Sequence, residues 1–288
     1  MKIAVASGKG GTGKTLVATS LAATWASRGH GVAYVDADVE EPNGHLFLSP
    51  RVEEERFCVK VPRLSGKRCE GSGKCNICAF NAIIPLGDSV MVFDQLCHSC
   101  GACVLACPGG YLVERDREIG TVSRGSAGDL RFWSARLDVG EARSTPLIEG
   151  LIGKAVAAED APERLVVIDS PPGTTCPAMA SVESADLVLM VTEPTPFGDH
   201  DLRLAVEMGK ALGKPMAAVV NRSDLGDDRV AETLAEAGVD VLARIPFERE
   251  VAAAYASGKM AIEECGGFAS RIVALADALD SRLEGASK

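Results

Sequence analysis

The strongest constraint on the fold is a glycine-rich stretch near the N-terminus. Residues 7–15 read Ser-Gly-Lys-Gly-Gly-Thr-Gly-Lys-Thr, and they follow a short apolar run, Ile3–Ala6. Apolar residues at helical spacing come next, at Leu16, Leu21, Ala22 and Trp25. A strand, a glycine-rich turn and a helix in this order form the setting of a phosphate-binding loop, because backbone N–H groups and the positive end of the helix dipole meet there. The pattern therefore predicts an α/β fold with a P-loop.

The residues of this loop have separate expected roles in binding a nucleotide. Lys14 can reach the β- and γ-phosphates, and Thr15 can place its hydroxyl on Mg²⁺. The glycines allow backbone N–H groups to point inward. The predicted nucleotide-binding residues of the loop are Gly8, Lys9, Gly10, Gly11, Thr12, Gly13, Lys14 and Thr15. We therefore expect ATP and Mg²⁺ as ligands.

Length and charge restrict the class of protein. A chain of 288 residues is expected to form one α/β domain with an insert. The formal net charge of −10 argues against a nucleic-acid partner. No apolar run approaches the roughly 18 residues of a transmembrane helix, and no signal peptide is expected before the first strand. The expected location is the cytoplasm.

Strand and helix patterns alternate along most of the chain. Expected strands are Val32–Val35, Leu165–Asp169, Leu187–Val191, Met216–Val220 and Val239–Ile245. Expected helices are Leu147–Ala158, Leu202–Leu212, Val230–Ala237 and Phe268–Leu283. The alternating segments Glu118–Arg124 and Leu130–Leu137 are expected to form a hairpin or a pair of edge strands. This succession predicts a doubly wound, mostly parallel α/β sheet.

Acidic residues stand where two of these strands end. Asp36 and Asp38 follow one strand, and Asp169 ends another, directly before Pro171-Pro172-Gly173. Ligands of α/β folds bind at the carboxyl ends of the strands. We expect Asp169 to hold Mg²⁺ in the manner of a Walker B aspartate, and we expect the Gly173 amide to approach the γ-phosphate.

A cysteine-rich stretch interrupts the α/β pattern from about Arg51 to about Arg117, with a short strand at Ser89–Phe93. Eight of the ten cysteines lie between Cys58 and Cys107. Cysteines of a cytoplasmic protein stay reduced, so this clustering indicates metal binding rather than disulfides. We expect residues 51–117 to form an inserted domain.

One cysteine motif of the insert is complete. Cys97-x2-Cys100-x2-Cys103-x3-Cys107-Pro108 is the bacterial ferredoxin signature, a spacing that zinc sites rarely use. In a two-cluster ferredoxin the last cysteine of each half ligates the other cluster. One 4Fe-4S cluster would then be held by Cys97, Cys100, Cys103 and Cys78.

The other half-motif is degenerate. It reads Cys69-x5-Cys75-x2-Cys78, and Ser72 occupies the slot of the missing cysteine. A second cluster would use Cys69, Cys75 and Cys107 and would lack one ligand. The Ser72 oxygen or Cys58 could supply it, or the site could hold a 3Fe-4S cluster or stay empty. We therefore expect one or two clusters, and a labile second one.

The two motifs together carry a resemblance to a known family. The loop Gly-Lys-Gly-Gly-Thr-Gly-Lys-Thr at 8–15 resembles the deviant Walker A loop of the MinD, ParA and nitrogenase iron-protein class. The stretch Thr192–Gly198 resembles the same family. The whole chain resembles MinD/Mrp-superfamily P-loop ATPases that carry an inserted ferredoxin domain. The resemblance implies a MinD-like ATPase domain at 1–50 and 118–288 and a ferredoxin-like α+β iron–sulfur insert at 51–117.

The resemblance also implies roles for single residues. Lys9 would cross a dimer interface to the phosphates in the partner, although a solvated loop charge is the simpler alternative. Asp38 would orient the attacking water and Asp36 would support Mg²⁺ through water, unless both merely cap a helix or loop. The implied catalytic residues are thus Lys9, Lys14 and Asp38.

For the base, the resemblance implies that Asn221 reads adenine and that Pro246 and Phe247 pack over it. A turn role for Asn221 and core packing for Phe247 are the alternatives.

Two cysteines lie outside the insert. Cys176 follows Asp169 by the offset at which the nitrogenase iron protein ligates a cluster shared between subunits. Residues 140–165 contain no second cysteine for such a site, so a packed thiol is the competing interpretation. Cys265 is expected to be structural.

The resemblance implies an ATPase that forms a homodimer, or a heterodimer with a paralogue, and that couples nucleotide state to the cluster. The output would be electron transfer to a redox partner, or cluster delivery to an iron–sulfur client in the manner of Mrp-type carriers. The alternative is a regulatory or spatial-positioning ATPase of the MinD/ParA kind. Membrane docking is not expected, because Arg271–Lys288 carries as many acidic as basic residues.

Overall fold

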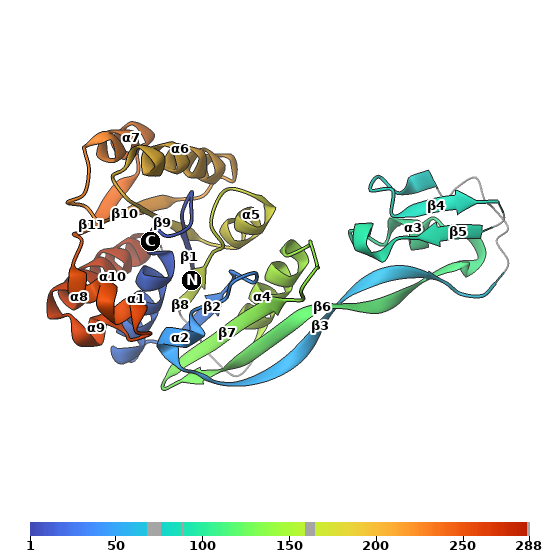
Figure 1. The fold of residues 1–288 in the computed structure, drawn as a ribbon, viewed down its shortest axis with the longest axis horizontal. Helices are drawn as coiled ribbons and strands as arrows, with labels where there is room; N and C mark the ends of the chain where they lie inside the picture. The colour runs from blue at the N-terminus through green and yellow to red at the C-terminus, as the bar shows by residue number, and fades with distance from the viewer. Residues whose placement is uncertain (68–75, 88, 159–164, 287–288) are drawn as a thin grey trace. The chain divides into compact units, whose positions relative to one another are not determined.

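The computed structural model describes residues 1–67, 76–87, 89–158 and 165–286, which form two compact units (Figure 1). Unit 1 comprises Met1–Glu55, Val122–Arg136 and Ser144–Lys288. Unit 2 comprises Arg56–Thr121 and Leu137–Arg143. The strands β3 and β6 contribute residues to both.

Among the described residues, nine strands form one sheet in the order β11-β10-β9-β1-β8-β2-β7-β6-β3. Their bounds are β1 Lys2–Ala6, β2 Val32–Asp36, β3 Arg51–Leu64, β6 Leu112–Ala127, β7 Leu130–Leu137, β8 Leu165–Asp169, β9 Leu187–Thr192, β10 Met216–Asn221 and β11 Asp240–Ile245. Every pairing from β11 to β7 is parallel. The predicted mostly parallel α/β sheet is confirmed.

Helices cover both faces of this sheet (Figure 1). The helices of unit 1 are α1 Lys14–Ser27, α2 His45–Leu48, α4 Thr145–Ala157, α5 Cys176–Glu183, α6 Pro196–Ala211, α7 Arg229–Ala237, α8 Arg249–Ala256, α9 Ala261–Glu264 and α10 Gly266–Ala286. Side chains alternate across β1: Ile3 and Val5 join the core that contains α1 and α10, whereas Ala4 and Ala6 join the core beneath α6 and α7. Because both faces are covered, these strands read as continuous apolar runs.

The predicted hairpin is present as β6 and β7, with β6 longer than expected, but it is not an edge pair because β3 lies outside it. The two residues between β6 and β7 include Gly128, whose φ of 62° suits a tight turn. The fourteen-residue strand β3 was not predicted. It is largely exposed and is held to β6 by polar pairs such as Arg56 with Glu118, so it lacks the apolar alternation that marks a strand. At Gly125 the two strands approach so closely that a Cβ would lie 1.8 Å from the Arg51 carbonyl oxygen.

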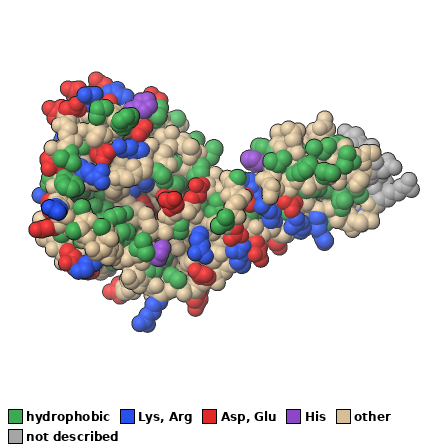
Figure 2. All heavy atoms as spheres, viewed as in Figure 1, with side chains coloured by type: hydrophobic (Ala, Val, Ile, Leu, Met, Phe, Trp, Pro, Cys, Tyr) green, Lys and Arg blue, Asp and Glu red, His purple; other side chains and the backbone are tan. Residues whose placement is uncertain are grey.

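Unit 2 carries a small antiparallel sheet and short helices. These elements are β4 Ile83–Leu86, β5 Ser89–Val92, η2 Asp94–Leu96, α3 Ala102–Leu105 and η3 Pro108–Gly110. The predicted strand at Ser89–Phe93 is thereby confirmed. The buried core consists of Ile83, Val90, Tyr111 and Leu112, with Cys78, Cys103 and Cys107 packed against it. Figure 2 shows further hydrophobic side chains gathered on the visible surface of this unit.

Candidate functional site

The glycine-rich loop lies between β1 and α1, as predicted. Gly11 and Gly13 have left-handed φ values of 78° and 95°, which a residue with a side chain adopts only under strain. A Cβ at Gly13 would also lie 2.4 Å from Asn221 Nδ2. That amide nitrogen donates a hydrogen bond of 2.8 Å to the Thr12 carbonyl oxygen. The loop is therefore anchored to the end of β10, and Asn221 is placed beside it.

Lys14 is buried at the start of α1, with an exposed fraction of 8%. Burial lowers the pKa of its ammonium group, and three nearby carboxylates oppose that shift. These carboxylates belong to Asp169, Asp38 and Asp36. The fold thus gathers four of the predicted site residues around the phosphate loop.

Asp169, at the end of β8, has one oxygen engaged and one without a partner. Its Oδ2 accepts a hydrogen bond of 2.9 Å from the hydroxyl of Tyr34. Its Oδ1 is buried and has no hydrogen-bond partner among the residues that the structure describes. Burial raises the pKa of Asp169, while Lys14 and the hydroxyls of Thr15 and Tyr34 act to lower it. An unpaired buried carboxylate oxygen near a threonine hydroxyl is a donor set that could hold Mg²⁺.

Asp36 and Asp38 have different surroundings. Asp36 is fully buried, and its carboxylate accepts hydrogen bonds from the amides of Asp38, Asn43 and Gly44 at 3.3, 3.0 and 2.8 Å. Asp36 thus caps the loop that follows β2, and its predicted support of Mg²⁺ through water stays a prediction. Asp38 is half-buried, and burial together with the charge of Asp169 raises its pKa to about 6.

Of the predicted second-switch and base-binding residues, Gly173 and Asn221 contact the glycine-rich loop. The Gly173 amide donates a hydrogen bond of 3.0 Å to the Ser7 carbonyl oxygen, so the segment predicted to be the second switch contacts the start of the glycine-rich loop. Pro246 and Phe247 follow Ile245, which pairs with Asn221 across β10 and β11. Phe247 is 46% exposed, so the core-packing alternative is wrong.

Lys9 is not a solvated loop charge. Its ammonium group forms an ion pair with Oε1 of Glu193, which directly follows β9. The other oxygen, Oε2, pairs with the Arg222 guanidinium at 2.7 Å. Burial acts to raise the pKa of Glu193, but the hydrogen bonds and charges of Lys9 and Arg222 outweigh it and leave the pKa below its ordinary value.

Sequence reasoning did not assign a role to Tyr34, Glu193 or Arg222. The sequence did contain a signal for Tyr34, because this residue places a hydroxyl in the otherwise apolar strand Val32–Val35, next to Asp36. Glu193 lies within the family-like stretch Thr192–Gly198, but its partner could not be read from that stretch.

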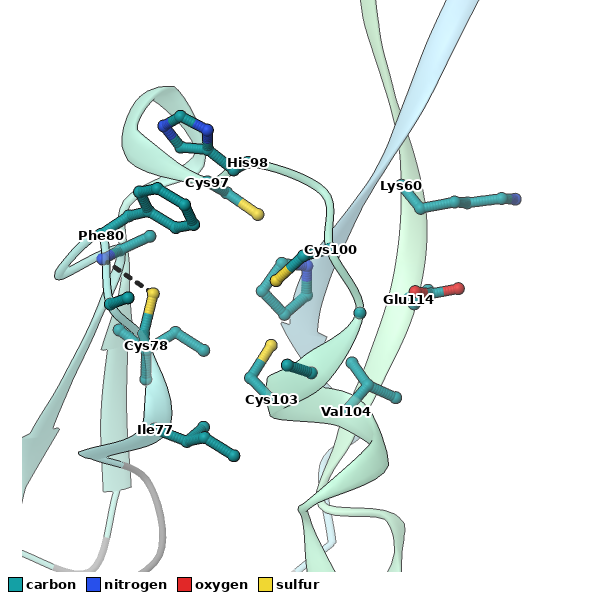
Figure 3. Close-up of a pocket in the computed structure, with 16 residues that line it drawn as sticks. Lys60, Ile77, Cys78, Phe80, Cys97, His98, Cys100, Cys103, Val104 and Glu114 are labelled. Carbon is teal, nitrogen blue, oxygen red and sulfur yellow. Dashed lines mark hydrogen bonds between the residues drawn. The ribbon is translucent and has the colours of Figure 1, made fainter. Parts of the chain in front are cut away.

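Four cysteines of unit 2 line one pocket of about 160 Å³. Cys78 precedes β4, Cys97 follows η2, Cys103 lies in α3 and Cys100 lies between them. Figure 3 shows their sulfur atoms directed toward a common space. Burial raises the pKa of the Cys103 thiol, and the charges of Cys97 and Cys100 add to this shift. The structure therefore brings together the cysteines that the ferredoxin plan assigns to one cluster.

Backbone amides donate to the sulfur atoms of this pocket. The Ala82 amide lies 3.3 Å from Cys78 Sγ, and the Ser99 amide lies 3.4 Å from Cys97 Sγ. Ser99 adopts a left-handed φ of 57° within this tight cysteine loop. Such N–H···S bonds stabilise negative charge on sulfur and tune cluster potentials. Within the described ranges, no three or more His, Cys, Asp or Glu side chains form a group suited to a single metal ion.

The predicted second cluster is not assembled in the described part of the chain. Cys69, Cys75 and the intervening Ser72 lie outside the described residues. Cys107 packs against the small core of unit 2, and its sulfur accepts a hydrogen bond of 3.3 Å from the Leu112 amide. Cys58 is exposed on β3. The ligand set of a second cluster therefore stays a prediction.

The two cysteines of unit 1 have opposite surroundings. Cys176 is exposed at the first residue of α5, so the packed-thiol interpretation is wrong for it. Cys265 is 5% exposed within the core that contains α1 and α10, which confirms its structural role. A search of the described residues finds no helix long and apolar enough to cross a membrane.

Known proteins match most of this chain in sequence. A protein of Methanocaldococcus jannaschii of uncharacterised role is 35% identical over 211 residues, 72% of each chain. An iron-sulfur cluster carrier protein of Pyrococcus abyssi is 29% identical over 262 residues, 86% of this chain and 74% of the carrier.

Solved structures show the same fold at low identity. The cell division ATPase MinD of Pyrococcus furiosus has a TM-score of 0.60 at 20% identity, covering 97% of this chain and 98% of its own. MinD of Pyrococcus horikoshii, complexed with Mg-ADP, has a TM-score of 0.60 at 19% identity. The match covers 100% of this chain and 98% of the MinD chain. The family model of the CobQ/CobB/MinD/ParA nucleotide binding domain matches residues 3–262. The chain therefore belongs to the CobQ/CobB/MinD/ParA family of nucleotide-binding proteins.

Proposed function

We propose that this protein is a dimeric, Mg²⁺-dependent ATPase that couples its nucleotide state to an iron–sulfur centre. The observation that carries the ATPase proposal is the convergence of Lys14, Asp38 and Asp169 beside the glycine-rich loop. The unpaired Oδ1 of Asp169 supports a metal ion at this position. The dimer would form between two copies of this chain or with a paralogue.

The reaction would be an in-line attack of water on the γ-phosphorus of ATP. The new bond joins the water oxygen to phosphorus, and the bond to the β–γ bridging oxygen breaks. Asp38 would orient the water, and Lys14 would offset the developing charge together with Lys9 of the partner subunit. Mg²⁺ held by Thr15 and Asp169, with Asp36 acting through water, would supply further charge neutralisation.

The remaining nucleotide contacts follow from the positions of β10 and β11. Asn221 would read adenine, because it lies at the loop and at the end of β10. Pro246 and the half-exposed Phe247 would cover the base. Gly173 would turn its amide from Ser7 toward the γ-phosphate.

The cluster proposal rests on four thiols in one pocket. Cys78, Cys97, Cys100 and Cys103 combine ferredoxin spacing with a shared space and N–H···S bonds. The small core of unit 2 adds support, because domains of this size commonly depend on metal ligation for stability. A 4Fe-4S cluster there would supply one-electron chemistry or serve as cargo.

Cluster delivery is the use that the relatives favour. Proteins named iron-sulfur cluster carriers match 86% of this chain at 27 to 29% identity. The degenerate half-motif also favours a labile centre. Electron transfer to a redox partner is the competing use. A MinD-like positioning role is the second candidate, and the MinD structures favour it through their fold alone.

Two variants test the ATPase proposal. Lys14→Ala should abolish hydrolysis, and Lys9→Ala should abolish both hydrolysis and ATP-dependent dimerisation measured by light scattering. Arg28→Ala, which removes ion pairs with Asp277 and Asp280, is the matched control and should retain wild-type turnover. Wild-type turnover in either lysine variant would exclude the assigned mechanism.

Anaerobic purification tests the cluster proposal. Iron and sulfide should reach at least four of each per chain, and Cys103→Ala should lower both whereas Cys265→Ala should not. Incubation with an apo-ferredoxin then separates the uses, because delivery transfers iron to the acceptor whereas electron transfer leaves the iron on this protein. Iron-free protein that resists anaerobic reconstitution would exclude both uses and leave the positioning ATPase.

A further inference from the structure

Glu193 occupies a rigid position at the end of β9. Its carbonyl oxygen accepts a hydrogen bond of 2.8 Å from the Thr195 amide, and the Thr195 hydroxyl lies 3.5 Å from Oε1. A Cβ at Gly198 would lie 2.2 Å from the same carbonyl oxygen, so the turn into α6 is tightly packed. The side chain of Glu193 is only 10% exposed. The carboxylate is therefore a fixed anion beside the phosphate loop.

Two cations share this carboxylate, one on each oxygen. Lys9 pairs with Oε1, and Arg222 pairs with Oε2. Lys9 extends from the loop on a flexible four-carbon side chain, whereas Arg222 follows Asn221 directly and donates its amide to the Asn221 oxygen at 3.0 Å. The Lys9 side chain can therefore rotate away from Glu193 without moving the backbone, and Arg222 can stay on Oε2 when it does.

In the single chain, Lys9 is therefore held by a carboxylate of its own subunit. We propose that Glu193 is a latch that retains Lys9 in the free subunit and that Lys9 must leave it when the ATP-bound dimer forms. This rests on the proposed role of Lys9 in the dimer. Glu193 is a positioning residue in this scheme and does not touch the reacting atoms.

Arg222 lowers the free-energy cost of releasing Lys9 from Glu193. A largely buried carboxylate that lost its only cation would be left desolvated and unpaired, which is costly. Because Arg222 keeps Oε2 paired, Glu193 still has a cation after Lys9 departs. The low pKa of Glu193 is consistent with a carboxylate that stays charged throughout. Glu193 and Arg222 should therefore affect dimerisation in opposite directions.

The test is the dimer dissociation constant, measured by sedimentation with a non-hydrolysable ATP analogue. Glu193→Gln keeps the side-chain shape but removes the charge that retains Lys9, so the dimer should tighten roughly threefold to tenfold. Arg222→Gln should weaken it by a similar factor. Glu141→Gln is the control, since Glu141 also bridges two cations, Arg117 and Arg143, and its loss should leave dimerisation unchanged.

The outcomes separate the latch from the underlying dimer proposal. If Lys9→Ala dimerises like wild type, the proposed role of Lys9 fails. If Lys9→Ala blocks dimerisation but Glu193→Gln leaves it unchanged or weaker, only the latch fails. Combining Glu193→Gln with Lys9→Ala should give no tightening, because the latch then has nothing to hold. Should Glu193→Gln not fold, the weakening expected from Arg222→Gln carries the test, and a tighter Arg222→Gln dimer overturns the latch.

Discussion

Replacing Tyr34 by phenylalanine removes one hydroxyl from the interior of unit 1 and leaves the packing of the ring in place. The ring stacks on Phe132 with centroids 5.8 Å apart, and the side chain is fully buried. The hydroxyl donates to Asp169 Oδ2, while Oδ1 has no hydrogen-bond partner in the described part of the chain. The substitution therefore leaves Thr15 and Lys14 as the remaining groups that favour the charged form of the buried Asp169 carboxylate.

The size of the effect follows from the kind of bond that is lost. A hydrogen bond to a buried charged group contributes about 1.5–3 kcal/mol, and no cavity term is added because the ring is retained. We expect the free energy of unfolding to fall by about 2 kcal/mol, which is roughly 1 M in the urea midpoint. The loss should shrink when Mg²⁺–ATP is present, since the metal would neutralise the same carboxylate.

Tryptophan fluorescence is the suitable assay, because both tryptophans, Trp25 and Trp133, lie in unit 1. Urea unfolding at pH 7.5 without nucleotide gives the midpoint. Tyr255→Phe is the control: its ring stacks on Phe47 at 4.5 Å, and its hydroxyl makes no hydrogen bond to a described residue. Equal midpoints for Tyr34→Phe and Tyr255→Phe would refute the assigned role of the Tyr34 hydroxyl.

Three further changes have defined outcomes. The pKa of Asp38 is raised from 3.8 to about 6, so its ionisation opposes folding above pH 6 and has no effect below about pH 4. Asp38→Asn should therefore stabilise the nucleotide-free protein by on the order of 1 kcal/mol at pH 7.5, after allowance for its partial exposure, and by nothing at pH 4, in urea titrations. Gly13→Ala combines a left-handed φ of 95° with a clash at Asn221, so ATP affinity in equilibrium titrations should fall at least about tenfold. Gly29→Ala, with a φ of 81° and no neighbour within 4 Å, should leave that affinity intact. Cys58→Ala should leave the iron content unchanged, and a fall would assign the exposed Cys58 thiol to the second cluster.

Three predictions that came from local patterns agree with the structure. The glycine-rich loop, the strand before it and the helix after it appear where their residues require them, because left-handed turns and helix starts depend on neighbours in the sequence. The apolar runs became the parallel strands, since burial on both faces selects continuous apolar residues. The cysteine spacing placed Cys97, Cys100 and Cys103 along one short loop and helix.

Other elements could not be predicted from the sequence, because they lack such patterns. The strand β3 is mostly exposed, so its sequence lacks the alternation of apolar residues that would predict a strand. Helices α8 and α9 are short and fill one side of the core beside α10, where tertiary packing rather than length stabilises them. Phe247 was ambiguous between core and base binding, and only its exposure excluded the core.

By itself the sequence determined the loop, the sheet class and the cysteine motif, since each is encoded by residues close together in the chain. Only the tertiary structure decided which polar groups meet. Tyr34 reaches Asp169 across 135 positions, and Lys9 reaches Glu193 across 184. A periodic pattern records whether a residue is buried, but it does not record which partner a buried charge finds. The lysine that suggested a dimer is, in the free subunit, held by a carboxylate that only the folded sheet brings to it.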